Sequence, residues 1–202
     1  MSTSEDWYAN RLLNIQKRKL KEILQINRLY AISLRRLKLG KTLEIGCGVG
    51  RILRYIPNST GVDHNSLSIA YARNVGCQAF TVEEFKEFMN HSNEVSPQEL
   101  FDSIIFPHVI EHLNLLEARE IVSDYLRYLK EDGSLVFVCP QESGYKSDST
   151  HKQFYDADDL IALGEFFGFS LLSKFSFPLP RVFGKFLRFN ETTVQMKRLN
   201  LK

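Results

Sequence analysis

The sequence is poor in the cysteines that staple small secreted domains and in the long apolar runs typical of membrane proteins. Its 202 residues include three cysteines and one tryptophan, and the formal net charge is +2. An odd number of widely spaced cysteines argues against a disulfide framework and against a cysteine-based metal site. No apolar stretch approaches the roughly 20 residues of a spanning helix, and the polar N-terminus lacks the apolar region of a signal peptide. These absences predict a cytoplasmic, soluble protein with free thiols and no membrane span.

The length and the apolar content predict a single core. With 44% hydrophobic residues, a chain of 202 residues can bury one sizeable core and has little left for a second. We expect one globular domain, residues 42–202, preceded by an N-terminal helical cap, residues 1–41. Apolar residues recur at helical spacing from Trp7 to Leu39, and Gly40 provides a C-terminal stop.

Charge is unevenly distributed along the chain. Residues 1–41 hold 10 Lys and Arg against 3 Asp and Glu, residues 42–173 hold 9 against 20, and residues 174–202 hold 7 against 1. Two explanations remain open. The basic ends pair with the acidic middle, or they face a phosphate-bearing partner.

The strongest motif is a short apolar run that breaks into alternating glycines, TLEIGCGVGR, which begins at Thr42. It predicts a buried strand, a tight turn and the start of a helix that Pro57 stops. Glycine allows positive φ in such a turn and lets a ligand approach main-chain atoms that a Cβ would block. A dinucleotide fingerprint would need a glycine where Arg51 stands, so the pattern is E-x-G-x-G-x-G. An ordinary glycine-rich turn is the alternative.

This motif resembles the first motif of the class I S-adenosylmethionine (SAM) dependent methyltransferases, in particular the small-molecule enzymes of types 11 and 23. The resemblance implies an α/β fold: a Rossmann-like, seven-stranded, mostly parallel sheet with helices on both faces and a C-terminal antiparallel strand pair. It also implies SAM as cofactor and S-adenosylhomocysteine (SAH) as product. The helices before the first strand would cover the cofactor or only pack on the sheet. The motif residues implied to bind the cofactor are Glu44, Gly46, Cys47, Gly48 and Gly50.

A further cofactor contact is expected where the second strand, Ser59–Asp63, ends. A carboxylate at this point can accept hydrogen bonds from both hydroxyls of a ribose. The resemblance gives Asp63 that role and places His64 beside the adenosine. The alternative for Asp63 is to cap the following helix, Leu67–Val75, although Asn65 is closer to its start.

The third expected strand, Gly76–Val82, leads to another acidic residue. Family members usually carry an acidic residue near this position that faces the adenine amino group, and the resemblance gives Glu83 that role. Alternatively, Glu83 and Glu84 only favour the start of the next helix, whose dipole stabilises negative charge. That helix is expected to end near Met89.

The fourth expected strand, Phe101–Phe106, delivers the sequence PHVIEH at its carboxyl end, where open α/β sheets bind ligands. The segment resembles the one that follows strand four in small-molecule methyltransferases, and Phe106 is expected to contact the cofactor. Spacings of three and four would place His108, Glu111 and His112 on one side of a helix. They are the catalytic candidates, and three alternative roles remain open. One of them accepts the proton of an acceptor hydroxyl, the three together hold a divalent ion, or they only line the site. Because His108 replaces the glutamate of metal-using relatives, no metal is expected.

The remaining sequence is expected to complete the sheet and to form the substrate loop. We expect a helix over Leu115–Leu129, a turn at Asp132-Gly133, a central strand over Ser134–Cys139 and a polar loop over Gln141–Phe154. His151 in that loop is a second candidate base, and packing within the loop is its alternative role.

Near the C-terminus, Asp156 and its acidic neighbours open a helix that Gly168 ends. The runs Phe169–Phe177 and Glu191–Lys197 are expected to form an antiparallel pair. Between them, residues 178–189 mix basic and aromatic side chains, which suits a lid, a lipid-facing hairpin or a dimer contact.

The function predicted from these features is SAM-dependent methylation of a small molecule at a hydroxyl group. The segment from Phe186 to Met196 resembles methyltransferases of cell-surface saccharide pathways, which suggests a sugar as acceptor. One alternative is an RNA methyltransferase that uses the basic termini, but nucleic acid is not the expected partner, because an aromatic-rich recognition module is missing. Another is a SAM-binding partner subunit without turnover. The oligomeric state is left open, with a homodimer as one option.

Overall fold

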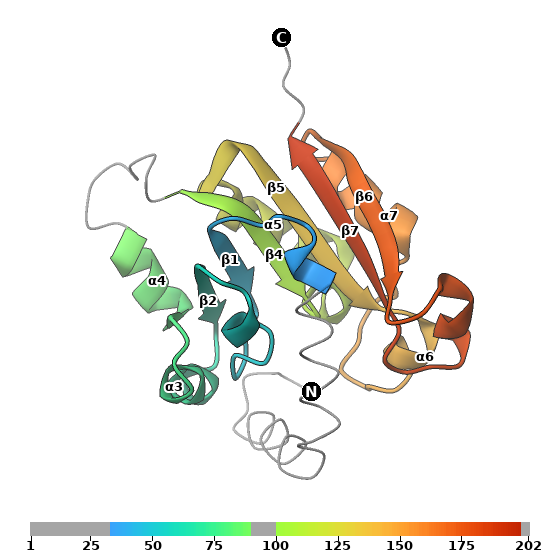
Figure 1. Ribbon diagram of the computed structural model, residues 1–202, viewed down its shortest axis with the longest axis horizontal. Coiled ribbons are helices and arrows are strands. Elements are labelled where there is room, and N and C mark those ends of the chain that lie inside the picture. The colour runs from blue at the N-terminus through green and yellow to red at the C-terminus, as the bar shows by residue number, and fades with distance from the viewer. Residues whose placement is uncertain (1–32, 90–99, 199–202) are drawn as a thin grey trace. The chain divides into compact units, whose positions relative to one another are not determined.

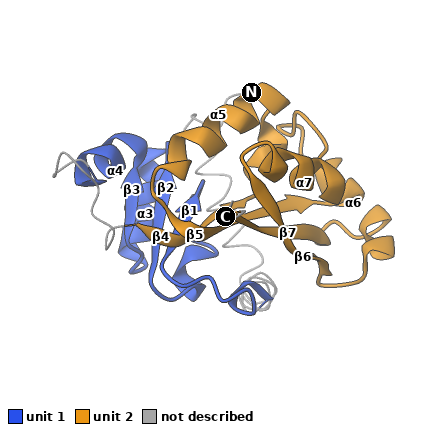
Figure 2. Ribbon diagram, turned by 90° about the horizontal axis from the view of Figure 1, so that it is seen from above, with its two compact units in different colours: residues 1–99 blue, residues 100–202 orange. Residues whose placement is uncertain are grey.

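The computed structural model describes residues 33–89 and 100–198 (Figure 1). The chain divides into two compact units, residues 1–99 and residues 100–202 (Figure 2). Most of the expected N-terminal cap, the whole loop that follows Met89 and the last four residues lie outside the described part.

In its described residues 33–89, the first unit contains three parallel strands and the helices α3 and α4. β1 pairs with β2 and β2 pairs with β3, both in parallel, and the two helices contact β2 and β3. The elements, in chain order, are β1 (Thr42–Ile45), the 3-10 turn η1 (Leu53–Tyr55), β2 (Ser59–Asp63), α3 (Ser66–Asn74), β3 (Ala79–Thr81) and α4 (Val82–Met89). A buried cluster that includes Cys47, Leu53 and Ile69 packs between the turn, α3 and β3. The cluster anchors the glycine turn on its inner side.

The second unit continues with strands of both directions. β4 pairs in parallel with β5, whereas β7 runs antiparallel to both β5 and β6. The elements are β4 (Phe101–Pro107), η2 (Ile110–His112), α5 (Leu115–Leu126), β5 (Leu129–Pro140), α6 (Glu142–Tyr145), α7 (Ala157–Glu165), β6 (Phe169–Phe177), η3 (Arg181–Lys185) and β7 (Glu191–Arg198). Residues 135–139 of β5 are fully buried, as the apolar run predicts for a central strand.

The seven strands form one mixed sheet in the order β3-β2-β1-β4-β5-β7-β6. This is the expected class of fold, mostly parallel with a C-terminal antiparallel pair. Capping residues set the helix starts: Asn65 accepts a hydrogen bond from Ser68 N at α3, and complete capping boxes begin at Asn114 for α5 and at Asp156 for α7. Within residues 33–89 and 100–198, every helix falls short of the length and apolarity needed to cross a membrane.

Three local predictions are wrong, each because neighbouring structure overrides the local pattern. The helix expected after the glycines is only η1, since φ of +73° at Gly50 delays its start and Ser59 Oγ donates to the carbonyl oxygens of Leu53 and Ile56 at its end. The expected turn at Asp132-Gly133 lies inside β5, as an irregularity in its pairing with β4.

The third wrong prediction concerns the loop after β5. Its first residues form the short helix α6, in which Tyr145 N donates to the carbonyl oxygen of Gln141 at 2.8 Å. The ends of two further elements also differ from the prediction, because β3 is shorter than expected and α5 stops at Leu126.

Candidate active site

The glycine turn follows the carboxyl end of β1 in a conformation that requires glycine. Gly46, Gly48 and Gly50 have φ of +70°, +51° and +73°. A Cβ on Gly48 would meet no atom within 4 Å, whereas a Cβ on Gly50 would lie 2.8 Å from Cys77 Sγ. Gly50 therefore lets the turn pack on its own unit, and Gly48 leaves open space in which a ligand can approach the backbone.

Asp63 connects the end of β2 to this turn. Its Oδ2 accepts a hydrogen bond from Gly48 N at 2.8 Å, and its Oδ1 accepts one from Asn65 N at 2.8 Å. Because Asn65 caps α3, Asp63 is not the helix cap. A carboxylate offers about four lone-pair positions, so Asp63 can still accept hydrogen bonds from a diol while holding the turn.

The other expected cofactor contacts occupy different surroundings. His64 is half-exposed with Nδ1 3.6 Å from Asp63 Oδ1, and Glu83 is exposed in the first turn of α4. Glu84, not Glu83, accepts the hydrogen bond from Thr81 N that holds the start of α4. Glu83 therefore has its carboxylate available to a ligand.

Three predicted cofactor residues have buried side chains. Glu44 is 2% exposed, Cys47 belongs to the buried cluster of the first unit, and Phe106 is fully buried and stacks on Phe137. Burial raises the pKa of the Cys47 thiol, and the nearby carboxylates of Glu44 and Asp63 raise it further. The ring of Phe106 packs in the core of the second unit, so the expected cofactor contact of Phe106 stays a prediction.

In the second unit, the residue that follows β4 has a strained backbone. His108 has φ of +58°, and η2 is a single 3-10 turn, so His108, Glu111 and His112 do not share one helical face as expected. Instead His108 lies between two carboxylates, with Nδ1 3.2 Å from Glu111 Oε1 and Nε2 2.9 Å from Glu191 Oε1. Burial lowers the pKa of His108, but Glu191 and Glu111 more than offset this and raise it to about 10. A ring that stays protonated at neutral pH cannot accept an acceptor's proton.

Glu111 is the most deeply buried member of this group. Its side chain is 1% exposed, and its Oε2 has no hydrogen-bond partner among the described residues. Burial raises the pKa of Glu111, but the hydrogen bond and charge of His108 outweigh it, so the pKa is lowered overall. Its charge, after burial itself, also raises the pKa of the Cys139 thiol. Glu111 is therefore a buried anion with one oxygen to spare.

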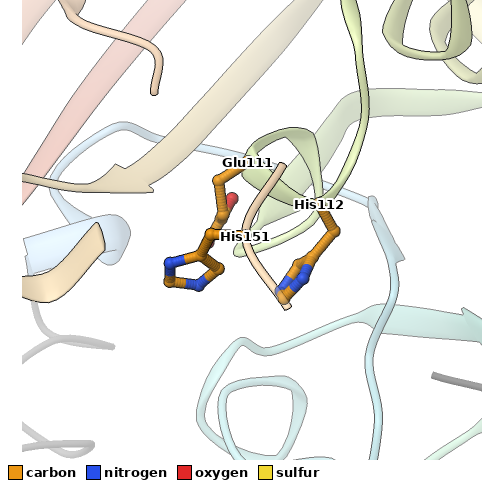
Figure 3. Close-up of side chains that lie close together, drawn as sticks. All are labelled: Glu111, His112 and His151. Atoms are coloured by element: carbon orange, nitrogen blue, oxygen red, sulfur yellow. The ribbon is translucent and has the colours of Figure 1, made fainter. Parts of the chain in front are cut away.

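His112 and His151 are brought together by the loop that follows α6 (Figure 3). Their ring centroids lie 4.8 Å apart in an edge-on arrangement. His112 Nδ1 is 3.2 Å from the carbonyl oxygen of Thr150, and His151 Nδ1 is 2.7 Å from that of Tyr145. Since a carbonyl oxygen only accepts, each Nδ1 carries a proton, and the neutral form of either ring has its lone pair on Nε2. Burial lowers the pKa of His112, so its ring is neutral at neutral pH.

The structure groups a different set of residues for metal binding than the sequence suggested. Ligand atoms of Glu111, His112 and His151 all lie within 4.8 Å of one another, and His108 is not part of the group. Two imidazoles and a carboxylate can bind a divalent ion, and imidazole Nδ1–H groups held by carbonyls are typical around such sites. Ligands at about 2.1 Å from one ion would have to move closer together than they are.

The sequence analysis did not identify two residues that contact the histidines of this site. Glu191 begins β7 and reaches His108 because β7 pairs with β5 so that Glu191 lies opposite Pro140. Tyr145 stacks on His151 with ring centroids 5.4 Å apart. No local signal identifies either residue, since each contact depends on how distant segments pair.

The carboxylates around His108 predict a stability effect that depends on pH. His108 has a raised pKa, so its contribution is complete below its ordinary value of 6.5 and is lost as pH rises through about 10. Glu111 has a lowered pKa, so its contribution is present above its ordinary value of 4.5 and is lost as pH falls below it. At pH 7, Glu191→Gln should lower the free energy of unfolding by about 2 kcal/mol, allowing for screening at the exposed side of His108.

Thermal unfolding of Glu191→Gln, His108→Gln and the double variant checks this. Each single variant should melt roughly 4–8 °C below wild type at pH 7, and the double variant should lose less than the sum. Glu142→Gln, which breaks the surface ion pair with Arg181, is the control. Equal losses for Glu142→Gln and Glu191→Gln, or full additivity, would show that the carboxylate–imidazole group is no more than a surface pair.

The mixed sheet, with a glycine turn after β1 and an acidic residue at the end of β2, defines the Rossmann-like class of SAM-dependent methyltransferases. Residues 15–174 match the family model described as a methyltransferase domain, and the chain belongs to this family. SAM is the cofactor, and the turn fits it because Gly48 leaves room and Asp63 offers free lone pairs. No curated protein matches the sequence.

Solved structures show the same fold at low sequence identity. A SAM-dependent methyltransferase from Archaeoglobus fulgidus aligns with a TM-score of 0.64 and 18% identity, over 85% of this chain and 94% of that one. Magnesium protoporphyrin IX methyltransferase from Synechocystis, with bound SAH, aligns with a TM-score of 0.66 and 14% identity, over 96% and 97%. An N-methyltransferase from Bradyrhizobium japonicum aligns with a TM-score of 0.60 and 16% identity, over 86% and 97%.

Asp63 carries a prediction about cofactor affinity. If Asp63 binds the ribose as predicted, Asp63→Ala should raise the dissociation constant of SAH roughly a hundredfold, because two charge-assisted hydrogen bonds would be lost. Asn65→Ala is the control, since it removes the cap of α3 at a cost of about 1 kcal/mol but leaves the carboxylate in place. Calorimetry with SAH measures both. An unchanged constant in Asp63→Ala would leave this residue only its hydrogen bonds from Gly48 N and Asn65 N.

Proposed function

We propose that the chain transfers the methyl group of SAM to a hydroxyl group of a small-molecule acceptor and that His112 takes the hydroxyl proton. The observation that carries this proposal is the state of the His112 ring. Nδ1 is held by the carbonyl oxygen of Thr150, the pKa is lowered by burial, and Nε2 keeps its lone pair. A neutral, oriented imidazole is a suitable base for a hydroxyl.

Different residues of the chain are proposed to bind the cofactor and to accept the proton. The open space at Gly48 admits the cofactor, Asp63 is proposed to hold the ribose, and Glu83 is proposed to face the adenine amino group. When bound, SAM supplies a methyl group activated by its sulfonium. His112 Nε2 would take the hydroxyl proton of the acceptor during the transfer. Orientation of the acceptor supplies much of the rate, because the displacement must be in line.

Glu111 and His151 are proposed to support His112. The buried carboxylate of Glu111 stabilises a proton on the neighbouring imidazole, and its charge raises the pKa of His112 against the effect of burial. His151 lies edge-on to that ring, and its Nδ1 donates to the carbonyl oxygen of Tyr145, so it is the second candidate base. His108, which is already protonated, is proposed to hold Glu111 in place.

The acceptor class that we propose is a sugar. The C-terminal segment resembles methyltransferases of cell-surface saccharide pathways, and sugars offer the hydroxyl groups that the proposed base requires. The compared structures include a magnesium protoporphyrin IX methyltransferase and an N-methyltransferase, and at 14–18% identity they do not choose among acceptors for this chain.

The test is methyl transfer from isotope-labelled SAM to pools of sugars and nucleotide sugars, with pools of amines and structured RNA in parallel. Label in a sugar as an alkali-stable methyl ether is the expected result. Label in an amine only would contradict the proposed hydroxyl acceptor. Salt-sensitive binding and labelling of RNA would favour the RNA methyltransferase. SAH binding without turnover on any pool would indicate a partner subunit.

Treatment with a chelator distinguishes catalysis by His112 as a base from catalysis by a metal ion. If His112 acts as a base, turnover should survive dialysis against a chelator. Loss of activity that a divalent ion restores would assign Glu111, His112 and His151 to a metal site instead.

A further inference from the structure

The excursion between β6 and β7 displays an unusual surface. Residues 178–190, here called the aromatic-basic loop, leave the sheet beside α6 and include η3 (Figure 1). Phe186 is 76% exposed, and other large apolar side chains of the loop are also exposed. These exposed side chains are Leu179, Val182, Phe183, Phe186, Leu187 and Phe189. Exposed apolar side chains that are this close together on the surface of a folded domain mark an interaction site.

The aromatic-basic loop is held in shape by buried polar contacts at its base. Asn190 is fully buried: its Nδ2 donates to Gln141 Oε1 at 2.8 Å, and its Oδ1 accepts from Leu179 N at 2.9 Å. A Cβ on Gly184 would overlap with the Gln141 side chain, so the loop packs closely on it. Arg181 forms two hydrogen bonds of 2.7 Å with the Glu142 carboxylate. These contacts fix the conformation in which the loop exposes its apolar side chains to solvent.

The charge of the loop has one sign. No acidic residue occurs between Pro178 and Asn190, while Lys185 and Arg188 lie among the exposed aromatic residues. Arg181 forms an ion pair with Glu142, whereas Lys185 and Arg188 are exposed. Aromatic and aliphatic side chains interspersed with cations suit the interface of an anionic lipid bilayer, where rings enter the headgroup region and cations meet lipid phosphates.

We infer that the aromatic-basic loop docks this protein on an anionic membrane surface. A second copy of the chain fits the loop less well, because a two-fold contact would bring Lys185 and Arg188 of both copies together. A closing lid also fits less well, since the buried Asn190 and Gln141 contacts leave the loop no free hinge at its base. A lipid surface satisfies both the apolar side chains and the cations.

Vesicle sedimentation tests this inference and requires no turnover. The full chain should bind vesicles of equal parts phosphatidylglycerol and phosphatidylcholine more tightly than vesicles of phosphatidylcholine alone, and added salt should release it. Phe186→Ser should weaken binding roughly tenfold, because the most exposed ring is lost. Lys185→Glu with Arg188→Glu should weaken it by at least about 25-fold, since each cation near the surface contributes about fivefold.

Matched controls lie outside the loop. Leu172→Ser removes an exposed apolar side chain from β6, and Lys86→Glu reverses an exposed charge on α4, and neither should change vesicle binding. Equal effects of loop and control variants, or absence of binding to the anionic vesicles, would overturn the inference. Light scattering that shows a dimer lost in Phe186→Ser would assign the loop to a second copy. Unchanged vesicle binding with a raised KM for a water-soluble acceptor would assign it to the substrate site.

Discussion

Replacing His112 by alanine is expected to lower the single-turnover rate of methyl transfer by about 10²- to 10⁴-fold, with little change in SAH affinity. The reason is that we propose Nε2 of His112 as the base, because burial keeps the ring neutral and the carbonyl oxygen of Thr150 holds Nδ1. In the wild type, the rate should be highest where the ring is unprotonated and should fall as pH drops through its pKa. Burial lowers that pKa below 6.5, so the fall should occur on the acidic side of 6.5.

The matched variants for this experiment are His151→Ala and Asn114→Ala. Asn114→Ala removes the cap of α5 two residues beyond His112, which costs about 1 kcal/mol of stability without touching the ring. It should retain the rate of wild type at a temperature where both are folded. If His112→Ala and His151→Ala each lose less than about tenfold, positioning of the acceptor is the source of catalysis and the proposed base is wrong. If only His151→Ala has the large effect, the base is His151.

The second large effect is expected at the glycine turn. Gly48→Val should weaken SAH binding by at least about a hundredfold, because the new side chain would occupy the open space beside the backbone in which we expect the cofactor to bind. The variant also forces a β-branched residue to φ of +51°, which destabilises the fold by itself. Calorimetry with SAH must therefore be compared with a variant that has the same strain.

Gly76→Val provides that comparison. Gly76 has φ of +87° and, like Gly48, would place its new side chain in open space, but it lies in the connection between α3 and β3. Both variants should melt below wild type, and only Gly48→Val should lose SAH. Equal loss of SAH in the two variants would mean that folding strain explains the effect. Tighter binding of NAD than of SAH by the wild type would contradict the assignment of the cofactor.

Local features of the chain could be predicted because their physical causes are local. The glycines at positions 46, 48 and 50 do adopt positive φ, and β2 ends at Asp63 where the pattern indicates. Asp156 caps α7 with its own side chain. Gly168, with φ of +78°, ends the turn between α7 and β6. Each depends on backbone preferences or on hydrogen bonds between residues a few positions apart.

The sequence by itself therefore determined the strands in their order along the chain, the glycine turn and, through its family resemblance, the class of cofactor. Only the tertiary structure decided which titratable groups meet. Strand β7 brings Glu191 to His108, and the loop after α6 brings His151 to His112, across 83 and 39 positions of the chain. The left-handed backbone at His108 separates it from His112, although their spacing suggests a shared helical face. Protonation depends on these distant charges and on burial, so the sequence could name the histidines but not distinguish the cation from the base.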